Sequence, residues 1–508
     1  MANMSKQTSN VVWVSLNMMV LFTAILSHEF IMEPLLHAYA SRGTGGIQEK
    51  DGYLALCIVY AFNAVGCFVA PWLVTRISGK WSMVVGICTL FLYEFAYLFP
   101  NRISILSISC IVGIGTTFLW VGQGQYISEN VSDNNREKNT SMQWAFFKMS
   151  LVFGGLFFLG FFHGASIESL VDNGQTHISG IILASLLKIG ANSTTVIYIT
   201  FTELAISSVN EKTATRLLSR LPTDRVQIFV IFFMILTILA SISTCFLPQT
   251  DMSQDRAPEP FLRASANFIK QLRQKRILLL STFFFYTGIS RSFWISIYPA
   301  CIKFTSRLSS NTTTTLALGM VVTGVGQVAG SLAVTASGRR VRKLGEHAFI
   351  ILALIIHIVL FVMISLSFPN DAPLGHTKGT GPVFDPTVSM TMTMSFLLGF
   401  GDAILQTQVY AYIAKYYQKE SGSVFSCFRF FAGIASTIMF FVAQFFNLAE
   451  HLCILIIGAC AAGIAIVLFH QSVNRSYQQK TSVVVVSVMP TARRTAPQNA
   501  IARVEALT

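Results

Sequence analysis

Apolar stretches about as long as a membrane helix recur along almost the whole chain. A bilayer core is about 30 Å thick, so a helix needs about 20 mostly apolar residues to cross it, and only helices or closed barrels satisfy their backbone hydrogen bonds there. The pattern predicts an all-α polytopic membrane protein with 12 transmembrane helices. The expected spans are 11–32, 53–75, 82–100, 103–126, 141–163, 225–247, 277–301, 315–335, 346–367, 388–413, 424–447 and 450–470.

A segment rich in proline and charge divides these spans into two sets of six. We therefore expect pseudo-symmetric halves of six helices each, of the kind found in the major facilitator superfamily. The predicted boundaries are an N-terminal half at 1–247, a cytoplasmic linker at 248–276, a C-terminal half at 277–470 and a disordered cytoplasmic tail at 471–508.

Weak sequence echoes six spans apart agree with an internal repeat. They pair Gly79-Lys80 with Gly338-Arg339-Arg340, Gln123-Gly-Gln125-Tyr126 with Gln406-Thr-Gln408-Val-Tyr410, and Lys148 with Arg429.

Two segments between spans are partly apolar. Residues 178–206 are apolar enough for a thirteenth span, but counting them would invert every later loop. We therefore expect an extracytoplasmic excursion at 164–224. In the linker, apolar residues recur at helical spacing from Phe261 to Leu272, which predicts an amphipathic helix in the lipid headgroup region, with a solvated spacer as the alternative.

Basic residues indicate the orientation, because short cytoplasmic loops retain Lys and Arg. With both termini cytoplasmic, most of the 36 basic residues fall on the inner side. The first span, which lacks a cleavage site, is then a signal anchor. Asn192 and Asn311 lie in sequons on the outer side and are glycosylation candidates.

The composition supports a membrane protein over a soluble one. Only 12% of the 508 residues are charged and 53% are hydrophobic. The net charge of +13 follows from the positive inner loops and favours contact with anionic lipid over nucleic-acid binding.

Ionisable residues inside spans are the strongest candidates for function, because a charge at the centre of a bilayer costs about 2.5 to 3.5 kcal/mol. Asp402 shares one helix face with Gln406, and its expected partners in the same half are Arg291 or Arg429. A structural ion pair and a transport site both stay open for these residues. The full set of candidates for a central cavity or ion pairs is Asp402, Arg291, Arg429, Lys148, Glu94, Gln123, Gln125, Gln406 and Gln408, with His357 as a further buried group.

Other chemistry has little support in the sequence. The Gly-x-Gly elements at 113–115, 122–124 and 324–330 lie inside spans without a preceding strand, so close helix packing explains them better than phosphate binding. We find no catalytic triad, no paired carboxylates and no metal-ligand spacing, and we expect no enzyme activity, no metal and no cofactor.

Several motifs distributed over the membrane portion resemble the Unc-ninety-three branch of the major facilitator superfamily. They are Gly52-Tyr53-Leu54, Trp81-Ser82-Met83, Phe99-Pro100-Asn101, Leu119-Trp120-Val121-Gly122-Gln123-Gly124, Tyr286-Thr287-Gly288, Ser292-Phe293-Trp294, Gly399-Phe400-Gly401-Asp402 and Thr407-Gln408. The resemblance implies a non-enzymatic regulator of a potassium channel, or a trafficking partner of a receptor, in the plasma membrane or an endolysosomal membrane.

Departures from the family pattern keep an alternative open. Ser290-Arg291 stands where the branch usually has an acidic residue, Gln406 replaces an asparagine, and the acidic residue of the superfamily loop signature is replaced near Thr75 and Thr335. A secondary transporter of a small solute or ion is the alternative, with Asp402 and its neighbours lining a midplane site.

Overall fold

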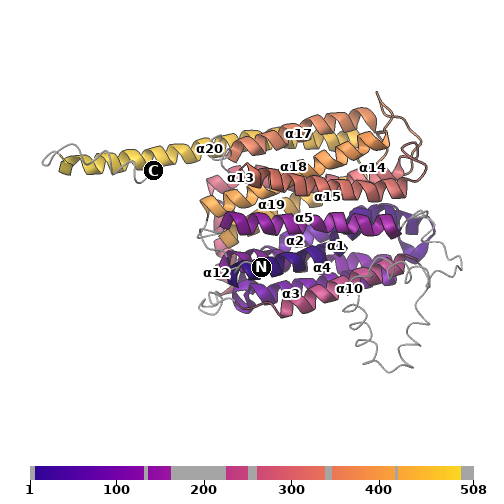
Figure 1. The fold of residues 1–508 in the computed structure, drawn as a ribbon, viewed down its shortest axis with the longest axis horizontal. Coiled ribbons are helices and arrows are strands. Elements are labelled where there is room, and N and C mark those ends of the chain that lie inside the picture. Colours follow the sequence, from indigo (N-terminus) through magenta and orange to yellow (C-terminus); the bar gives the residue numbers. More distant parts are fainter. Residues whose placement is uncertain are drawn as a thin grey trace, which may run out of the picture.

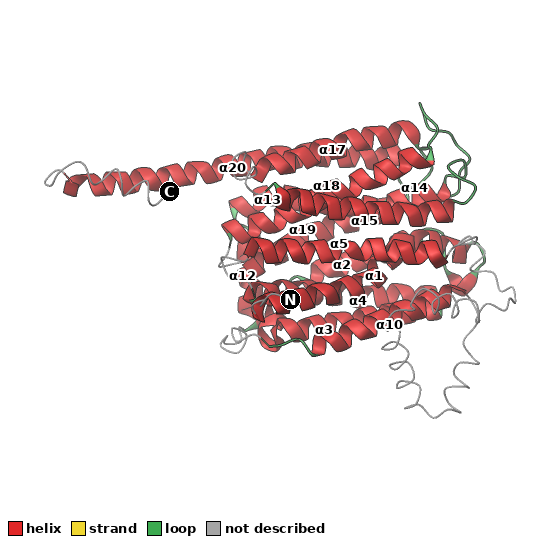
Figure 2. Ribbon diagram, viewed as in Figure 1, coloured by secondary structure: helices red, strands yellow, loops and turns green. Residues whose placement is uncertain are grey.

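The computed structural model describes residues 6–130, 136–161, 225–249, 260–337, 346–417 and 421–492. These residues are almost entirely helical (Figure 2). The elements are α1 (Lys6–Ala40), the short 3₁₀ turn η1 (Thr44–Gly46), α2 (Asp51–Gly66), α3 (Ala70–Leu98), α4 (Arg102–Glu129), α5 (Arg136–Phe161), α10 (Arg225–Cys245), α12 (Phe261–Leu272), α13 (Lys275–Ser292), the π-helical turn η2 (Phe293–Ile297), α14 (Tyr298–Phe304), α15 (Thr312–Ala336), α17 (Glu346–Ser367), α18 (Val388–Tyr416), α19 (Ser421–Val442) and α20 (Leu448–Ala492). The expected excursion at 164–224, with Asn192, lies outside the described residues, as do Gly338 to Arg340.

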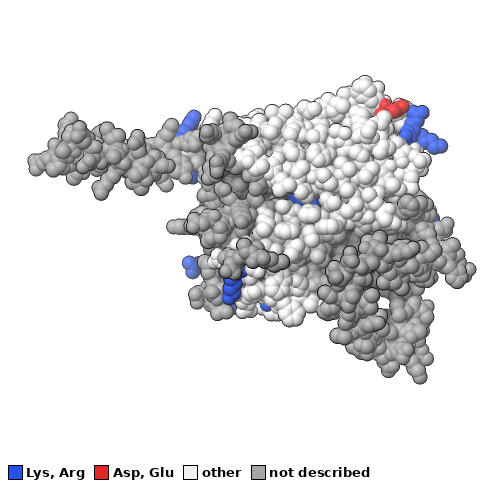
Figure 3. Space-filling model, viewed as in Figure 1, with Lys and Arg blue, Asp and Glu red and all other residues white. Residues whose placement is uncertain are grey.

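Within the described residues, ten helices are long and apolar enough to cross a bilayer. Their outer surface suits that environment, because Leu352, Ile355 and Val359 form an exposed apolar stripe along α17. Figure 3 shows Lys, Arg, Asp and Glu side chains mostly near the two ends of the visible face, with a largely uncharged surface between them. The chain is therefore an integral multi-pass membrane protein.

The helices lie side by side, and segments from the two ends of the sequence gather on opposite sides of the bundle (Figure 1). We call residues 6–249 the N-terminal part and residues 260–492 the C-terminal part. Helices α1 to α4 and α10 lie on one side, α15, α17, α18 and α20 lie on the other, and α5 and α19 lie between them. The two parts are joined where α5 packs against α15 and α2 packs against α19.

Glycines allow several of these helices to approach closely. A Cβ at Gly326 would lie 2.2 Å from the carbonyl oxygen of Phe396, and one at Gly330 would lie 2.4 Å from that of Phe400, so α15 and α18 meet backbone to backbone. The packing role expected for the glycine motifs is confirmed here. Gly124 is an exception, because a Cβ there would meet nothing within 4 Å.

The second expected span is interrupted in the structure. Helix α2 ends at Gly66, a turn follows, and α3 contains a break at Ser78, where the backbone has φ 71° and ψ 163°. This break falls between the expected spans 53–75 and 82–100, and the adjacent Gly79 packs against a carbonyl oxygen of α4. The expected span 53–75 is therefore kinked after Gly66, and the break at Ser78 separates it from the next expected span.

The seventh expected span is a continuous helical run whose hydrogen-bonding pattern changes. Helix α13 passes directly into η2 and then α14, which has Pro299 in its first turn. Proline has no backbone N–H and its ring clashes with the carbonyl of the residue four positions earlier. The π-helical turn Phe293–Ile297 lies directly before α14, where the proline nitrogen cannot take part in a regular helical hydrogen bond.

The linker contains the expected helix. Phe268 of α12 is buried, and its ring centroid lies 5.0 Å from that of Phe68 and 5.9 Å from that of Phe430. Helix α12 therefore contacts both the N-terminal part and the C-terminal part.

The tail corrects one expectation. Disorder was predicted from Gln471 onward, but α20 continues to Ala492 and extends beyond the bundle (Figure 1). The residues between Gly463 and Pro490 include no glycine or proline, so nothing in the local sequence ends the helix.

Candidate functional site

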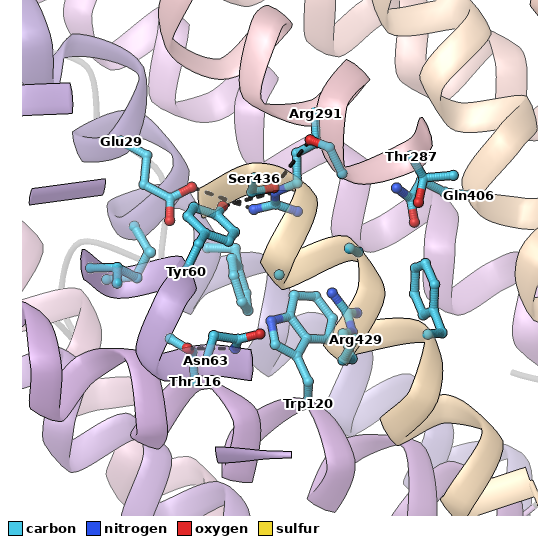
Figure 4. Close-up of a pocket in the computed structure, with 17 residues that line it drawn as sticks. Glu29, Tyr60, Asn63, Thr116, Trp120, Thr287, Arg291, Gln406, Arg429 and Ser436 are labelled. Carbon is cyan, nitrogen blue, oxygen red and sulfur yellow. Dashed lines mark hydrogen bonds and ion pairs between the residues drawn. The ribbon is translucent and has the colours of Figure 1, made fainter. Parts of the chain in front are cut away.

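A small cavity with a mostly apolar lining and a few charged and polar side chains lies between the two parts of the chain, near the middle of the bundle. Its volume is about 40 Å³, which is room for a few water molecules. Helices α1, α2 and α4 supply one wall, and α13, α18 and α19 supply the other. Figure 4 draws the lining side chains and labels three charged ones among them, Glu29, Arg291 and Arg429.

Arg291 forms an ion pair across the cavity. Its Nη2 atom lies 3.4 Å from Oε2 of Glu29, and its Nε donates a hydrogen bond to the hydroxyl oxygen of Tyr60 at 3.0 Å. Glu29 lies on α1 and Arg291 on α13, so the pair links the N-terminal part to the C-terminal part (Figure 4). The side chains are 11% and 19% exposed because they face the cavity.

Arg429 occupies a different part of the cavity wall. Its guanidinium carbon lies 4.2 Å from the centroid of the Trp120 ring, and its Nη2 donates a hydrogen bond to the Tyr410 hydroxyl at 2.8 Å. The first contact is a cation–π interaction with a residue of α4. Arg429 is thus held by aromatic groups from α4 and α18.

Asp402 is paired with a residue of the N-terminal part. Its Oδ2 atom accepts a hydrogen bond from Nζ of Lys148 at 2.9 Å and from Nε2 of Gln327 at 3.2 Å. The expected partners, Arg291 and Arg429, were therefore wrong. The reason is the contact of α5 with α15, which brings Lys148 next to α18 because α15 and α18 are themselves in close contact.

Glu94 also has a partner that the sequence analysis did not name. Its Oε2 atom lies 2.8 Å from Nδ1 of His28, and both side chains are fully buried. This contact joins α1 to α3 within the N-terminal part. Neither residue lines the cavity.

The four candidate glutamines are not brought together. Gln406 lines the cavity, whereas Gln123 and Gln408 are buried outside its lining and Gln125 donates a hydrogen bond to Glu129 at 2.7 Å. His357 forms a hydrogen bond within the C-terminal part, in which its Nδ1 atom lies 2.8 Å from the Tyr286 hydroxyl oxygen.

Several cavity residues were absent from the expected site. The most important is Glu29, which neutralises Arg291. Its position inside an apolar span was the available signal, because an ionisable residue there needs a partner or a cavity. Tyr60 and Trp120 carried no comparable signal, since aromatic residues are common in membrane helices.

Relatives of known sequence agree with the architecture. A family profile described as "Ion channel regulatory protein UNC-93" matches residues 43–467. The UNC93-like protein MFSD11 of Xenopus tropicalis is 24% identical over 89% of this chain and 94% of its own length. Protein unc-93 homolog A of Bos taurus is 23% identical over 91% of this chain and 93% of its own length.

Solved structures show the same fold at low sequence identity. The fucose transporter FucP in its outward conformation aligns with a TM-score of 0.56 at 11% identity, covering 91% of this chain and 98% of FucP. The human organic anion transporter MFSD10 aligns with a TM-score of 0.57 at 14% identity, covering 92% of this chain and all of that one. The fold is that of the major facilitator superfamily, and the profile match over most of the sequence shows that the chain belongs to the UNC-93 family.

Proposed function

We propose that this chain is a non-enzymatic regulator or trafficking partner of a membrane channel, a potassium channel in the first instance, or of a receptor. The observation that carries the proposal is the family match over residues 43–467, whose description names ion channel regulation. The buried ion pairs between the two parts support a mechanism. They hold the bundle in one arrangement, and a change in that arrangement would alter the outer surface that a partner contacts.

Coexpression with a two-pore potassium channel tests this proposal. We expect the wild-type chain to change the current or the surface level of the channel, and Asp402→Asn to weaken that effect by loosening the contact between α5 and α18. Arg307→Gln is the matched control. The Arg307 side chain is 52% exposed and lies in the loop between α14 and α15, outside the buried ion pairs. The proposal fails if no channel responds and crosslinking in native membranes recovers no integral membrane partner.

A second function, secondary transport of a small solute or ion, is favoured by the cavity. Transporters of this superfamily bind their solute near the midplane at the interface of the two halves, and the cavity has walls from both parts of the chain. Its volume of about 40 Å³ is that of a closed arrangement, so transport would require the parts to move. Flux measured in proteoliposomes, with Asp402→Asn as the comparison, tests this function; a folded protein without flux for any solute would refute it.

The remaining expectations form part of the same proposal. Two further spans would raise the number from ten to 12, in two halves of six. One consists of α2 and the start of α3, and the other of the run α13–η2–α14. Both termini would face the cytoplasm, in the plasma membrane or an endolysosomal membrane. Asn311 would carry a glycan on the opposite side, and α12 would lie in the lipid headgroup region, consistent with exposed Leu262 and Ile269.

A further inference from the structure

We propose that the central cavity binds a small monocarboxylate, of the size of formate or acetate, through Arg429. This inference goes beyond both functions above, because a bound anion can be a transported solute or a ligand that sets the state of a regulator. It depends on the charges and hydrogen bonds of the cavity wall.

The cations inside the bundle differ in how they are neutralised. Lys148 is paired with Asp402 and Arg291 with Glu29. Among the residues that the structure describes, no carboxylate lies within ion-pair distance of Arg429. A guanidinium inside a membrane bundle is costly without a counter-charge, and an anionic ligand would supply one.

Arg429 has hydrogen-bond donors that its described neighbours do not use. A guanidinium has five N–H donors in a planar fork that matches the two oxygens of a carboxylate. The Tyr410 hydroxyl accepts from one of the two Nη atoms at 2.8 Å, and Trp120 covers one face of the group. These contacts fix its orientation without using the remaining donors, and Arg429 itself lines the cavity (Figure 4).

A second polar group of the wall is also without a partner. Gln406 lines the cavity, its side chain is largely buried, and it makes no hydrogen bond to the described residues. By contrast, the neighbouring amide of Asn63 donates to the Thr116 hydroxyl at 3.1 Å. The Gln406 amide can therefore donate to a ligand oxygen, and a buried amide without a partner is unfavourable unless a ligand or water supplies one.

Charge and volume define the class of ligand. The described charged residues of the wall are Glu29, Arg291 and Arg429, so a monoanion would make the cavity neutral. A volume of about 40 Å³ excludes sugars and aromatic acids from this arrangement but accommodates a group of a few heavy atoms. A planar carboxylate matches the guanidinium fork better than a spherical halide does.

Ligand-dependent thermal stability of the full-length protein in lipid nanodiscs tests the proposal. Sodium formate and sodium acetate are titrated against a sodium sulfate background at constant ionic strength, with sodium chloride as a separate arm. We expect a saturable rise in Tm with formate or acetate for the parent protein. Arg429→Gln should raise the apparent Kd about tenfold or more, whereas Arg307→Gln, which removes an exposed arginine, should leave it unchanged.

Further variants keep the test decisive if Arg429→Gln does not fold. Arg429→Lys retains the charge but not the fork, and Gln406→Leu removes the second donor; each should weaken binding several-fold. The proposal is overturned if the parent shows no saturable shift, if chloride acts as strongly as the carboxylates, or if the Arg429 variants bind as the parent does. Saturable binding in a protein that carries no flux would refute transport and leave this site intact.

Discussion

Removing one partner of the Lys148–Asp402 ion pair should destabilise the protein strongly, whereas removing both should not. The Nζ and Oδ2 atoms are 2.9 Å apart, and at an effective dielectric constant of about 20 their attraction is about 6 kcal/mol. The side chains are only 5% and 3% exposed, so the loss of hydration offsets much of that attraction. A single remaining charge would keep the hydration loss without the attraction, which costs about 3 to 5 kcal/mol.

The informative comparison is a double-mutant cycle with Asp402→Asn, Lys148→Met and both together. Asparagine preserves an oxygen that can accept the hydrogen bond from Gln327, so the cycle isolates the charges. We expect each single variant to have a clearly lower Tm and the double variant to be about as stable as the parent. The assay is thermal unfolding of purified full-length protein in one detergent, followed by size-exclusion chromatography of the soluble fraction.

A Tm decrease in the double variant equal to the sum of the two single decreases would refute the idea that Lys148 and Asp402 stabilise each other. It would mean that each group is stabilised by separate surroundings and not by the other. Arg307→Gln serves as the control for removing a positive charge, because its contact with Asp385 is 3.9 Å long and both side chains are more than half exposed. Its Tm should change little, since exposed ion pairs contribute about 0 to 1 kcal/mol.

Three further predictions address the cavity, the helix packing and the topology. Glu29→Gln should lower the free energy of unfolding by about 1 to 2 kcal/mol, which is less than for Asp402→Asn, because the 3.4 Å contact between Glu29 and Arg291 is more exposed. Equal decreases in Tm for the two variants would contradict this ranking. Gly326→Ala should cost about 1 to 3 kcal/mol because the added Cβ meets a carbonyl oxygen of α18, whereas the matched Gly124→Ala should be neutral in the same assay. Endoglycosidase should increase the gel mobility of the parent, and Asn311→Gln should remove part of that shift; an unchanged shift would argue against a glycan at this sequon.

Sequence pattern was sufficient for the class of fold because the bilayer imposes a length and a composition on each helix. Most expected spans therefore coincide with described helices to within a few residues. Pattern located the break at Ser78, which falls between two expected spans, but it missed the kink after Gly66 and the helix beyond Gln471. A kink inside an apolar run does not change its hydrophobicity, and hydrophobicity does not report whether a polar tail stays helical.

The candidate site was predictable as a set of residues but not as a set of pairs. Charges inside apolar spans are visible in the sequence, and Arg291, Arg429, Lys148 and Asp402 all lie in the interior of the bundle. Their partners depend on which helices of the two parts are adjacent. Local spacing shows which residues share a helix face, but the approach of Lys148 to Asp402, 254 positions apart, follows only from the assembled bundle.

The position of the cavity links its occupancy to the relative placement of the two parts. Glu29 and Arg291 belong to different parts, and both face the space in which Arg429 would hold an anion. A carboxylate bound there would compete with Glu29 for the Arg291 guanidinium, and separation of α1 from α13 would change the affinity of the site in turn. A ligand shifts such an equilibrium only by its difference in affinity for the two arrangements, and a tenfold difference is worth about 1.4 kcal/mol. A shift of that size would change the ratio of the two arrangements about tenfold, which would bias a regulator or favour one access state of a transporter. In either function, opening of the Glu29–Arg291 pair would accompany binding of the anion, and the functions differ in whether the anion leaves on the side from which it entered.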